Sequence, residues 1–496
     1  MTGKFPVLYD MAKRVPNKTG ANRPNIILFV TDQQRGDCLS LDGSTPVQTP
    51  HIDELGGRGV WFRRAYSACP LCMPARRTLM TGMKPSSHGV LGNVNREFTF
   101  TTLPEVLRAA GYQTHCVGKM HLWPKRKRYG FDSMDWSDGP YEGEDIGDYG
   151  EFLLQYAGGV PLPAQAHGVT LNSWIGGPWH LDDRLHFTNW VTDNALRFLQ
   201  HRDPTSPYFL KVSYFHPHHP VACPEFYYNR YITMDLPEPV CGDWARISDT
   251  PAAGTPVRTR KAHLAPALVK QYQAGYYGCI NHIDNQIGRI LDYADLPGQS
   301  GRETMFIFLS DHGEMLGDHH RIGKRFPYEQ SARIPFVIKF PESSGVSAGQ
   351  IRDEPVELMD VMPTVLDAAG LRNPDTVEGD SLLPLLRGES AQWREYLHGE
   401  CAHASFLDPV PEPMQYMTDG KRKYVWYPIQ DVEQYFDLEA DPKETHDLAG
   451  DREYAGEISM WRQRLIAELG NRPEGFVSDG ELRAVSEITS VLPSEG

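Results

Sequence analysis

Asn25-Ile26-Ile27-Leu28-Phe29-Val30-Thr31-Asp32 is the stretch that decides the fold of this chain. It is a continuous apolar run, and a carboxylate ends it. A strand with water on one face would alternate apolar and polar residues, whereas a strand buried on both faces reads as an unbroken apolar run. The stretch therefore predicts an inner strand of a parallel sheet that is covered on both faces.

Other segments along the chain repeat this pattern and alternate with helical ones. Residues 208–214 and 305–310 are two further buried strands by the same criterion, and residues 112–117 follow a helical segment at 103–110. Residues 270–292 form a long amphipathic pattern between the last two strands. Strands that alternate with helices predict an α/β fold, with a large, mostly parallel mixed sheet sandwiched between helices.

The length of 496 residues exceeds what one hydrophobic core usually serves, so a large and a smaller domain are expected. After residue 371 the pattern changes to short strand-like runs at 424–427 and 434–438, followed by a helix at 455–469. The predicted organisation is an N-terminal arm at 1–23, a main domain at 24–375 with a loop-rich insertion over the site at 133–190, and a C-terminal α+β subdomain at 376–496 with a short antiparallel sheet.

Composition and charge exclude several classes of protein. Forty per cent hydrophobic and 23% charged residues are ordinary for a soluble globular protein. A net charge of −15 argues against nucleic acid and anionic membranes as partners, and it requires any anion site to be locally basic. The N-terminus has no apolar signal segment, and no run approaches the roughly 18 apolar residues that span a bilayer. The eight cysteines imply no disulfide framework, so a cytoplasmic location is expected.

Polar residues with chemical potential follow the predicted strands directly. Open α/β sheets place their sites beyond the carboxyl ends of the strands, so the fold prediction and the site prediction support each other. The residues in these positions are Asp32, Lys119, His121, His218, Asp311 and His312.

A second stretch, Cys72-Met73-Pro74-Ala75-Arg76, predicts a helix start. Pro74 suits a first helical turn, and Gly82 supplies a stop. Cys72 would then lie at the positive end of the helix, with Arg76 one turn further on. A sulfur atom, a helix N-terminus and a guanidinium together describe a site for a tetrahedral oxyanion, although a small buried cysteine beside a solvated arginine fits the local pattern equally well.

Cys-x-Pro-x-Arg followed by Leu-Met-Thr-Gly resembles the signature of the type I sulfatases, in the alkaline phosphatase superfamily. The resemblance implies an alkaline phosphatase-like fold. It also implies that a formylglycine-generating enzyme oxidises Cys72 to Cα-formylglycine, whose hydrated aldehyde attacks sulfur and becomes transiently sulfated.

Further motifs of that family recur along residues 24–470. Gly118-Lys119-Met120-His121 matches its GK-x-H motif, and Pro217-His218-His219-Pro220 matches PH-x-P. By resemblance, Lys119 and Lys324 contact the sulfate, His121 assists its release, and His218 faces the leaving-group oxygen. The catalytic set implied is Cys72, Arg76, Lys119, His121, His218 and Lys324, with Gln33, Asn93, Lys119, His218 and Lys324 binding substrate.

The resemblance also implies one divalent metal ion, held by Asp32, Asp311, His312 and the oxygen at position 72. Carboxylate oxygens favour Ca²⁺, whereas an imidazole ligand also suits Mn²⁺ or Zn²⁺. Many family members carry Asp-Asp at the first strand end and Asp-Asn at the last, where this chain has Asp32-Gln33 and Asp311-His312.

These observations predict a sulfatase that cleaves a small-molecule or saccharide sulfate monoester to an alcohol and inorganic sulfate. One alternative is a phosphonate monoester or phosphodiester hydrolase on the same scaffold, but those enzymes carry neutral hydroxyl residues in place of Lys119 and His121. A second alternative is a non-catalytic binder of sulfated glycans with unmodified Cys72. The sequence leaves open whether the ester is a sugar, aryl or choline sulfate, and it leaves the oligomeric state open.

Overall fold

The structure is a computed structural model that describes residues 23–97, 99–139, 147–156, 172–245, 259–296, 302–389, 392–402 and 412–492. The predicted N-terminal arm, apart from Arg23, lies outside the described residues. Within these ranges no helix is both long and apolar enough to cross a lipid bilayer.

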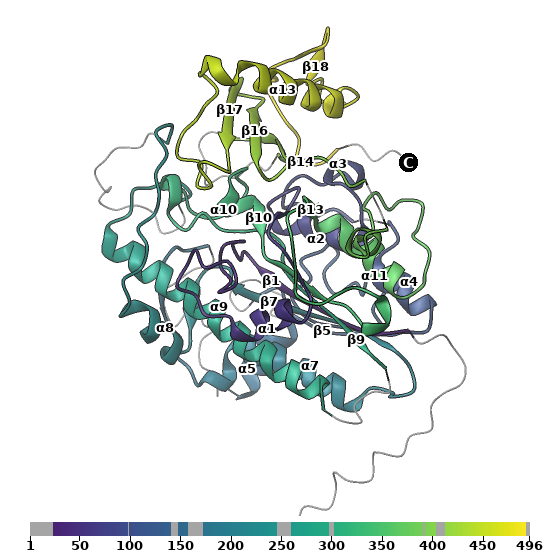
Figure 1. The fold of residues 1–496 in the computed structure, drawn as a ribbon. Coiled ribbons are helices and arrows are strands. Elements are labelled where there is room, and N and C mark those ends of the chain that lie inside the picture. Colours follow the sequence, from purple (N-terminus) through teal and green to yellow (C-terminus); the bar gives the residue numbers. More distant parts are fainter. Residues whose placement is uncertain are drawn as a thin grey trace, which may run out of the picture.

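An eight-stranded mixed sheet forms the centre of the molecule (Figure 1). The inner strands run parallel, and β11 runs antiparallel to both of its neighbours. Across the sheet the order is β12 (Gln350–Arg352), β2 (Val60–Phe62), β11 (Phe336–Lys339), β9 (Thr304–Ser310), β1 (Asn25–Asp32), β7 (Tyr208–Pro217), β4 (Gln113–Gly118) and β5 (Ser133–Trp136).

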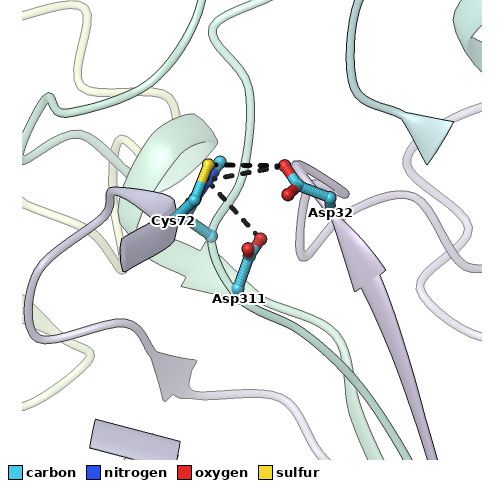
Figure 2. Close-up of side chains that lie close together, drawn as sticks. Asp32, Cys72 and Asp311 are labelled. Atoms are coloured by element: carbon cyan, nitrogen blue, oxygen red, sulfur yellow. Dashed lines mark hydrogen bonds and ion pairs between the residues drawn. The ribbon is translucent and has the colours of Figure 1, made fainter. Parts of the chain in front are cut away.

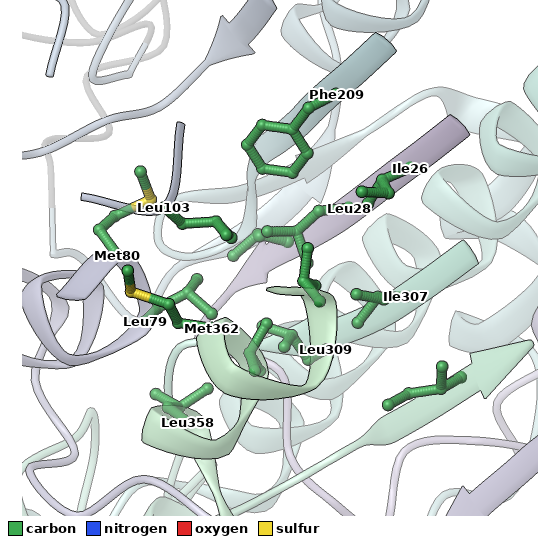
Figure 3. Packing of buried hydrophobic residues seen from close by; sticks show 14 of the residues in the cluster. Ile26, Leu28, Leu79, Met80, Leu103, Phe209, Ile307, Leu309, Leu358 and Met362 are labelled. Atoms are coloured by element: carbon green, nitrogen blue, oxygen red, sulfur yellow. The ribbon is translucent and has the colours of Figure 1, made fainter. Parts of the chain in front are cut away.

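Strand β1 is buried along its whole length, as its sequence predicts. Its side chains divide between two cores, because successive residues of a strand point to opposite faces of the sheet. Ile26 and Leu28 pack into one core, shown in Figure 3, whereas Ile27 and Phe29 pack into the other. The predicted α/β class with a covered, mostly parallel sheet is therefore confirmed.

Helices cover both faces of the sheet. The first core is covered by α2 (Cys72–Thr81), α4 (Leu103–Ala109), α11 (Val361–Ala368) and α12 (Leu382–Leu386). The second core is covered by α1 (Pro50–Gly57), α5 (Gly147–Tyr156), α7 (Phe187–His201) and the long α9 (Pro266–Ala294).

A separate four-stranded antiparallel sheet lies beyond one end of the main sheet, with helix α13 packed on it (Figure 1). The strands and the helix predicted for the C-terminal part are therefore present. The boundary near residue 375 stays a prediction, and α12, which follows it, packs in the main core. The elements are β14 (Leu397–Cys401), β15 (Met414–Thr418), β16 (Arg422–Tyr427), β17 (Val432–Asp437) and α13 (Ala455–Leu469).

Short elements complete the described chain. The strands are β3 (Ala65–Tyr66), β6 (Gly176–Pro178), β8 (Val221–Cys223), β10 (Arg333–Ile334), β13 (Val356–Glu357), β18 (Val477–Ser478) and β19 (Glu481–Leu482). The short helices are α3 (Pro85–His88), α8 (Glu225–Ile232), α10 (Glu329–Ala332), η1 (Asp183–Leu185), η2 (Asp318–His320), η3 (Glu342–Ser344), η4 (Leu358–Asp360) and η5 (Arg452–Tyr454).

The segment predicted as a loop-rich insertion, 133–190, contains more regular structure than its sequence indicates. Strand β5 is an edge strand of the main sheet, and α5 packs into the second core. An edge strand is covered less completely than an inner one, and Ser133 at its start is exposed, so β5 lacks the unbroken apolar run. Residues 140–146 and 157–171 lie outside the described residues.

Candidate active site

Two neighbouring strands deliver the carboxylates of the site. Strand β1 ends at Asp32, and β9 ends one residue before Asp311, with Thr31 and Ser310 paired across the two parallel strands. Asp311 N donates to Thr31 O at 3.2 Å, which holds the two strand ends together. The carboxylates of Asp32 and Asp311 therefore lie side by side at the carboxyl edge of the sheet (Figure 2).

Cys72 faces these carboxylates from the first position of α2. Its side chain is buried, and its Sγ lies 3.2 Å from His312 Nε2, 3.0 Å from Lys324 Nζ and 3.7 Å from Asp32 Oδ1. Asn93 Oδ1 accepts a hydrogen bond from Met73 N at 3.0 Å. Asn93 thus satisfies one of the unpaired N–H groups of the helix start, a contact that the substrate-binding prediction did not include.

Arg76 binds the carboxylates of both Asp32 and Asp311. Its Nε donates to Asp311 Oδ2 at 2.8 Å and its Nη2 to Asp32 Oδ2 at 3.1 Å. Its Nη1 donates to Ser213 Oγ at 3.0 Å. Here the guanidinium holds the acidic side chains in place, so a direct contact between Arg76 and the substrate anion stays a prediction.

Lys119 and His121 follow strand β4. Lys119 Nζ lies 2.6 Å from Asp32 Oδ2 and 5.0 Å from the centroid of the Phe215 ring. His121 adopts a left-handed backbone conformation, with φ 52°, and its side chain contributes to lowering the pKa of Cys72. The GK-x-H segment therefore places the side chains of Lys119 and His121 near Cys72.

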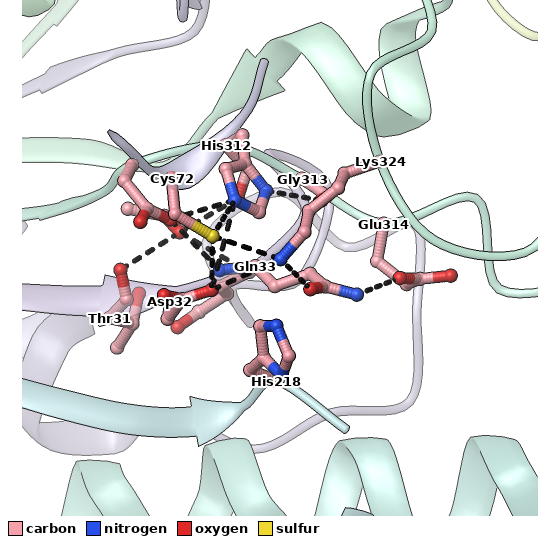
Figure 4. A network of polar contacts seen from close by, with 12 residues as sticks. Thr31, Asp32, Gln33, Cys72, His218, His312, Gly313, Glu314 and Lys324 are labelled. Atoms are coloured by element: carbon pink, nitrogen blue, oxygen red, sulfur yellow. Dashed lines mark hydrogen bonds and ion pairs between the residues drawn. The ribbon is translucent and has the colours of Figure 1, made fainter. Parts of the chain in front are cut away.

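His218 comes directly after strand β7, and its ring is buried (Figure 4). Its Nδ1 makes a 2.8 Å hydrogen bond with His219 O, which leaves Nε2 for the site. Burial, and then the charge of Lys324, lower the pKa of His218 to about 4.

Lys324 reaches the site from the loop after β9. Its Nζ donates to Gln33 Oε1 at 2.8 Å in addition to its contact with Cys72 (Figure 4). Gln33 itself has φ 71°, and its backbone N–H donates to Asp311 Oδ1 at 3.1 Å. All the residues predicted from the sequence as catalytic or metal-binding are thus brought together around Cys72.

The lysines of the site favour an anion at position 72. Burial raises the pKa of the Cys72 thiol, but Lys324 and Lys119 outweigh it and hold that pKa well below its usual range. Burial and the Cys72 charge likewise raise the pKa of Asp32, and Lys119 and Lys324 again prevail and lower it. An anion at position 72 is therefore stabilised by its surroundings.

The donor set at the strand ends fits a divalent metal ion. Asp32, Cys72, Asp311 and His312 each offer one ligand atom, and these atoms lie within 4.8 Å of one another. All four side chains are buried, and two carboxylates this close together favour a cation between them.

Sequence reasoning missed three residues that surround this set. Glu314, His219 and Tyr272 are fully buried: Gln33 hydrogen-bonds the first two, and His219 hydrogen-bonds Tyr272 (Glu314 is labelled in Figure 4). His219 is the variable position of the PH-x-P motif and Glu314 follows His312 by two residues, but only the fold shows that they meet Tyr272 of α9.

Comparisons with known proteins agree with this geometry. The chain matches the family described as Sulfatase over residues 24–371, and residues 317–470 match the family described as N-sulphoglucosamine sulphohydrolase, C-terminal. Because the first match spans well over half of the chain, this protein belongs to the sulfatase family, a class of sulfuric ester hydrolases in the alkaline phosphatase superfamily.

Three relatives illustrate the range of the family. An arylsulfatase of Clostridium perfringens is 39% identical, over 93% of this chain and 97% of its own. An N-acetylglucosamine-6-O-sulfatase of Bacteroides thetaiotaomicron is 26% identical, over 89% of this chain and 85% of its own. The crystal structure of a phosphonate monoester hydrolase of Agrobacterium radiobacter has a TM-score of 0.75 and 25% identity, over 90% of this chain and 95% of its own.

Proposed function

We propose that this chain hydrolyses sulfate monoesters to an alcohol and inorganic sulfate, with Cys72 matured to Cα-formylglycine. The observation that carries the proposal is that Cys72 is buried in one cluster with Lys119, Lys324 and the carboxylates of Asp32 and Asp311. Membership of the sulfatase family and the likeness to an arylsulfatase support it.

When present, the formylglycine hydrate supplies the nucleophile, and a divalent cation lowers its pKa and neutralises developing charge. Asp32, Asp311 and His312 would hold the cation together with the oxygen at position 72. Among the candidate metals we favour Ca²⁺, because two of the three unmodified ligands are carboxylates, although His312 would also suit Mn²⁺ or Zn²⁺.

The protein's own cations bind and orient the ester. Lys119 and Lys324 converge on Cys72, so both can neutralise the oxygens of a sulfate held there. This placement meets the need for a locally basic site in a chain with a net charge of −15.

Two histidines have geometry suited to moving protons. His218 donates a proton to the departing alcohol oxygen when the S–O bond of the ester breaks. Burial and then the charge of Lys324 hold the pKa of His218 low, and an anionic sulfate beside the ring would act against both by stabilising its protonated form. His121, next to Cys72, takes a proton from the side chain at position 72 during the release of sulfate.

A phosphonate monoester or phosphodiester hydrolase is the second candidate, favoured by the likeness in fold to the Agrobacterium radiobacter enzyme. Such a substrate needs room for a second substituent. Lys119 occupies the space between Asp32 and the Phe215 ring with a long cationic side chain, so we place sulfate esters first.

Turnover of an aryl sulfate, a panel of sulfated sugars and choline sulfate tests the proposal. Wild-type enzyme whose residue-72 peptide has the lower mass of formylglycine should release sulfate from at least one of them. Cys72→Ala and Cys72→Ser should lose activity and keep the wild-type unfolding midpoint, because α2 does not need the thiol. Matured enzyme that turns over none of these esters, or a Cys72→Ala variant within tenfold of wild type, would contradict it.

A further inference from the structure

Four buried side chains form a closed ring of polar contacts behind Lys324. They are Gln33, His219, Tyr272 and Glu314, and each is fully buried. Gln33 Nε2 hydrogen-bonds Glu314 Oε2 and lies 3.1 Å from His219 Nδ1, and His219 Nε2 hydrogen-bonds the Tyr272 hydroxyl. His219 Nε2 also lies 3.5 Å from Glu314 Oε2, which closes the ring, and the Tyr272 hydroxyl helps to lower the pKa of Glu314. The amide of Gln33 is the member that faces the site (Figure 4).

The chemistry of its neighbours fixes the orientation of that amide. Lys324 Nζ can only donate, so the Gln33 atom 2.8 Å away must be the amide oxygen. The Glu314 carboxylate can only accept, so the atom facing it must be the amide nitrogen. The second N–H of the amide faces His219 Nδ1, which makes Nδ1 an acceptor and leaves the ring proton on Nε2 for Tyr272.

Glu314 also fixes the loop that carries Lys324. Its other oxygen, Oε1, accepts hydrogen bonds from Leu316 N at 2.9 Å and from Gly323 N at 2.5 Å. Gly323 directly precedes Lys324. One carboxylate therefore holds both the backbone before Lys324 and the amide that binds the Lys324 ammonium.

We propose that Glu314 is a positioning residue, which sets the direction of the Gln33 amide and thereby aims the Lys324 ammonium at the reacting group on residue 72. His219 and Tyr272 complete the ring and stop the amide from turning over. This role rests on the proposed function, because it matters only if Lys324 binds the sulfate being transferred.

Glu314→Gln tests the proposal with almost no change in shape. Two backbone N–H groups still require an oxygen at the Oε1 position, so the new NH₂ group must face Gln33. Gln33 then has a hydrogen-bond donor on each side, Lys324 and the NH₂ group of residue 314. Its amide oxygen can accept from only one of them. If the amide turns its oxygen toward residue 314, its own NH₂ group faces the Lys324 ammonium. We expect kcat/KM for the best sulfate ester to fall on the order of 10-fold to 100-fold, the scale for weakening one contact to a developing anion, and inhibition by inorganic sulfate to weaken several-fold.

A compensating variant separates positioning from simple stability. In Gln33→Glu combined with Glu314→Gln, the net charge is unchanged, and residue 33 again accepts from Lys324 while the amide at 314 donates to it. This double variant should regain most of the lost kcat/KM and of the sulfate inhibition. Tyr272→Phe, which removes only the hydroxyl of the ring, should lower kcat/KM about threefold to tenfold, and it serves as a second test should Glu314→Gln fold poorly.

Glu444→Gln is the matched control, because Glu444 is also a fully buried glutamate that accepts from a backbone N–H and from a lysine, in its case Glu329 N and Lys423 Nζ. It should lower the unfolding midpoint and leave kcat/KM per folded molecule unchanged. The proposal is overturned if Glu314→Gln keeps kcat/KM within twofold of wild type, or if the double variant is no better than the single one. An inactive wild type would instead refute the proposed function.

Discussion

Asp32 is the residue on which the cations of the site converge. Lys119 and Arg76 bind one of its oxygens at 2.6 and 3.1 Å, and Lys324 lies 3.9 Å from the other. A fully buried carboxylate requires such compensation, because removing one partner of a buried ion pair typically costs 3–5 kcal/mol. Lys119 and Lys324 are also the cations that we propose bind the sulfate, so stability and substrate binding would depend on the same two charges.

The place of some site residues could be predicted from the sequence, and the place of others could not. Asp32, Asp311 and His312 were predictable because they lie at the carboxyl ends of two apolar strands, and the edge of a parallel sheet brings such residues together. Glu314 was not predictable, because a glutamate in a loop is normally solvated, and its partner Tyr272 lies on α9, far away in the chain. The sequence did not show that Arg76 would bind the two carboxylates, and its predicted contact with the substrate anion stays a prediction.

The pair Lys119 and His121 should decide between sulfate and phosphate diesters. Replacing both by serine removes a cation from the sulfate oxygens and opens the space between Asp32 and Phe215. Sulfate ester hydrolysis should fall on the order of 10²-fold or more, the scale for losing an oxyanion contact, whereas phosphodiester hydrolysis should fall less or rise. Steady-state kinetics on an aryl sulfate and on the matching aryl phosphodiester measure both.

Lys127→Ser is the control for that double variant, because Lys127 is a surface lysine paired with Glu97 and lies outside the site. It should leave both activities as in wild type. Equal loss of the two activities in the double variant would show that Lys119 and His121 do not discriminate between the substrates, as would a wild type that prefers phosphonates.

Among the elements, the end of β4 leaves no room for a side chain at Gly118. Gly118 has φ 89°, and a Cβ atom placed on it would lie 2.1 Å from the carbonyl oxygen of Ser213 on β7. Lys119 N donates to that same oxygen at 3.0 Å. The glycine therefore allows β4 to approach β7 closely enough for Lys119 to reach Asp32.

Gly118→Ala should both destabilise the protein and displace Lys119. A backbone oxygen cannot give way as a flexible side chain can, so β4 must move, and we expect kcat/KM to fall at least tenfold together with a lower unfolding midpoint. Gly111→Ala is the matched control, because Gly111 has nearly the same φ, 90°, but nothing within 4 Å of its Cβ position. It should cost about 1–2 kcal/mol of stability, the cost of the left-handed conformation for a residue with a Cβ atom, and leave kcat/KM unchanged. Similar activity in the two variants would contradict the argument.

Elements with strong internal patterns were predictable, and those defined by neighbours were not. Strands β1 and β9 and helices α9 and α13 lie where their own sequences place them, because each buries a continuous run or a clear apolar stripe. Strand β5 owes its existence to pairing with β4, which no local pattern reveals.

On the scale of the whole molecule, buried polar contacts join the C-terminal sheet to the catalytic part. Lys423 Nζ on β16 is buried between Glu329 of α10 and Glu444, at 2.8 Å from each. Trp244 stacks on Tyr328 and donates to Glu444 O at 2.8 Å. These contacts join residues far apart in the chain, so the sequence predicts the two units but not how they meet.

Histidines buried in their neutral form are spread through the molecule and should make it unstable in acid. Burial lowers the pKa of His88 to about 3 and that of His186 to about 4, and neither residue belongs to the proposed catalytic set. In the unfolded chain both would titrate near 6.5. Below that pH the unfolded state binds more protons than the folded state, so stability is fully present at pH 7 and above and is lost as the pH falls toward 4. At pH 5 the loss is about 2 kcal/mol for each such histidine.

His186→Asn isolates one of these contributions. Asparagine can still accept the hydrogen bond from Thr188 N that His186 Nδ1 accepts at 3.1 Å at the start of α7, but it cannot be protonated. Denaturant unfolding at pH 7 and pH 5 should show that the variant loses about 2 kcal/mol less stability between the two pH values than wild type does. His201→Asn, at an exposed position on the same helix, should keep the wild-type difference. If His186→Asn shows the wild-type pH dependence as well, burial of a neutral His186 is not a source of the acid sensitivity.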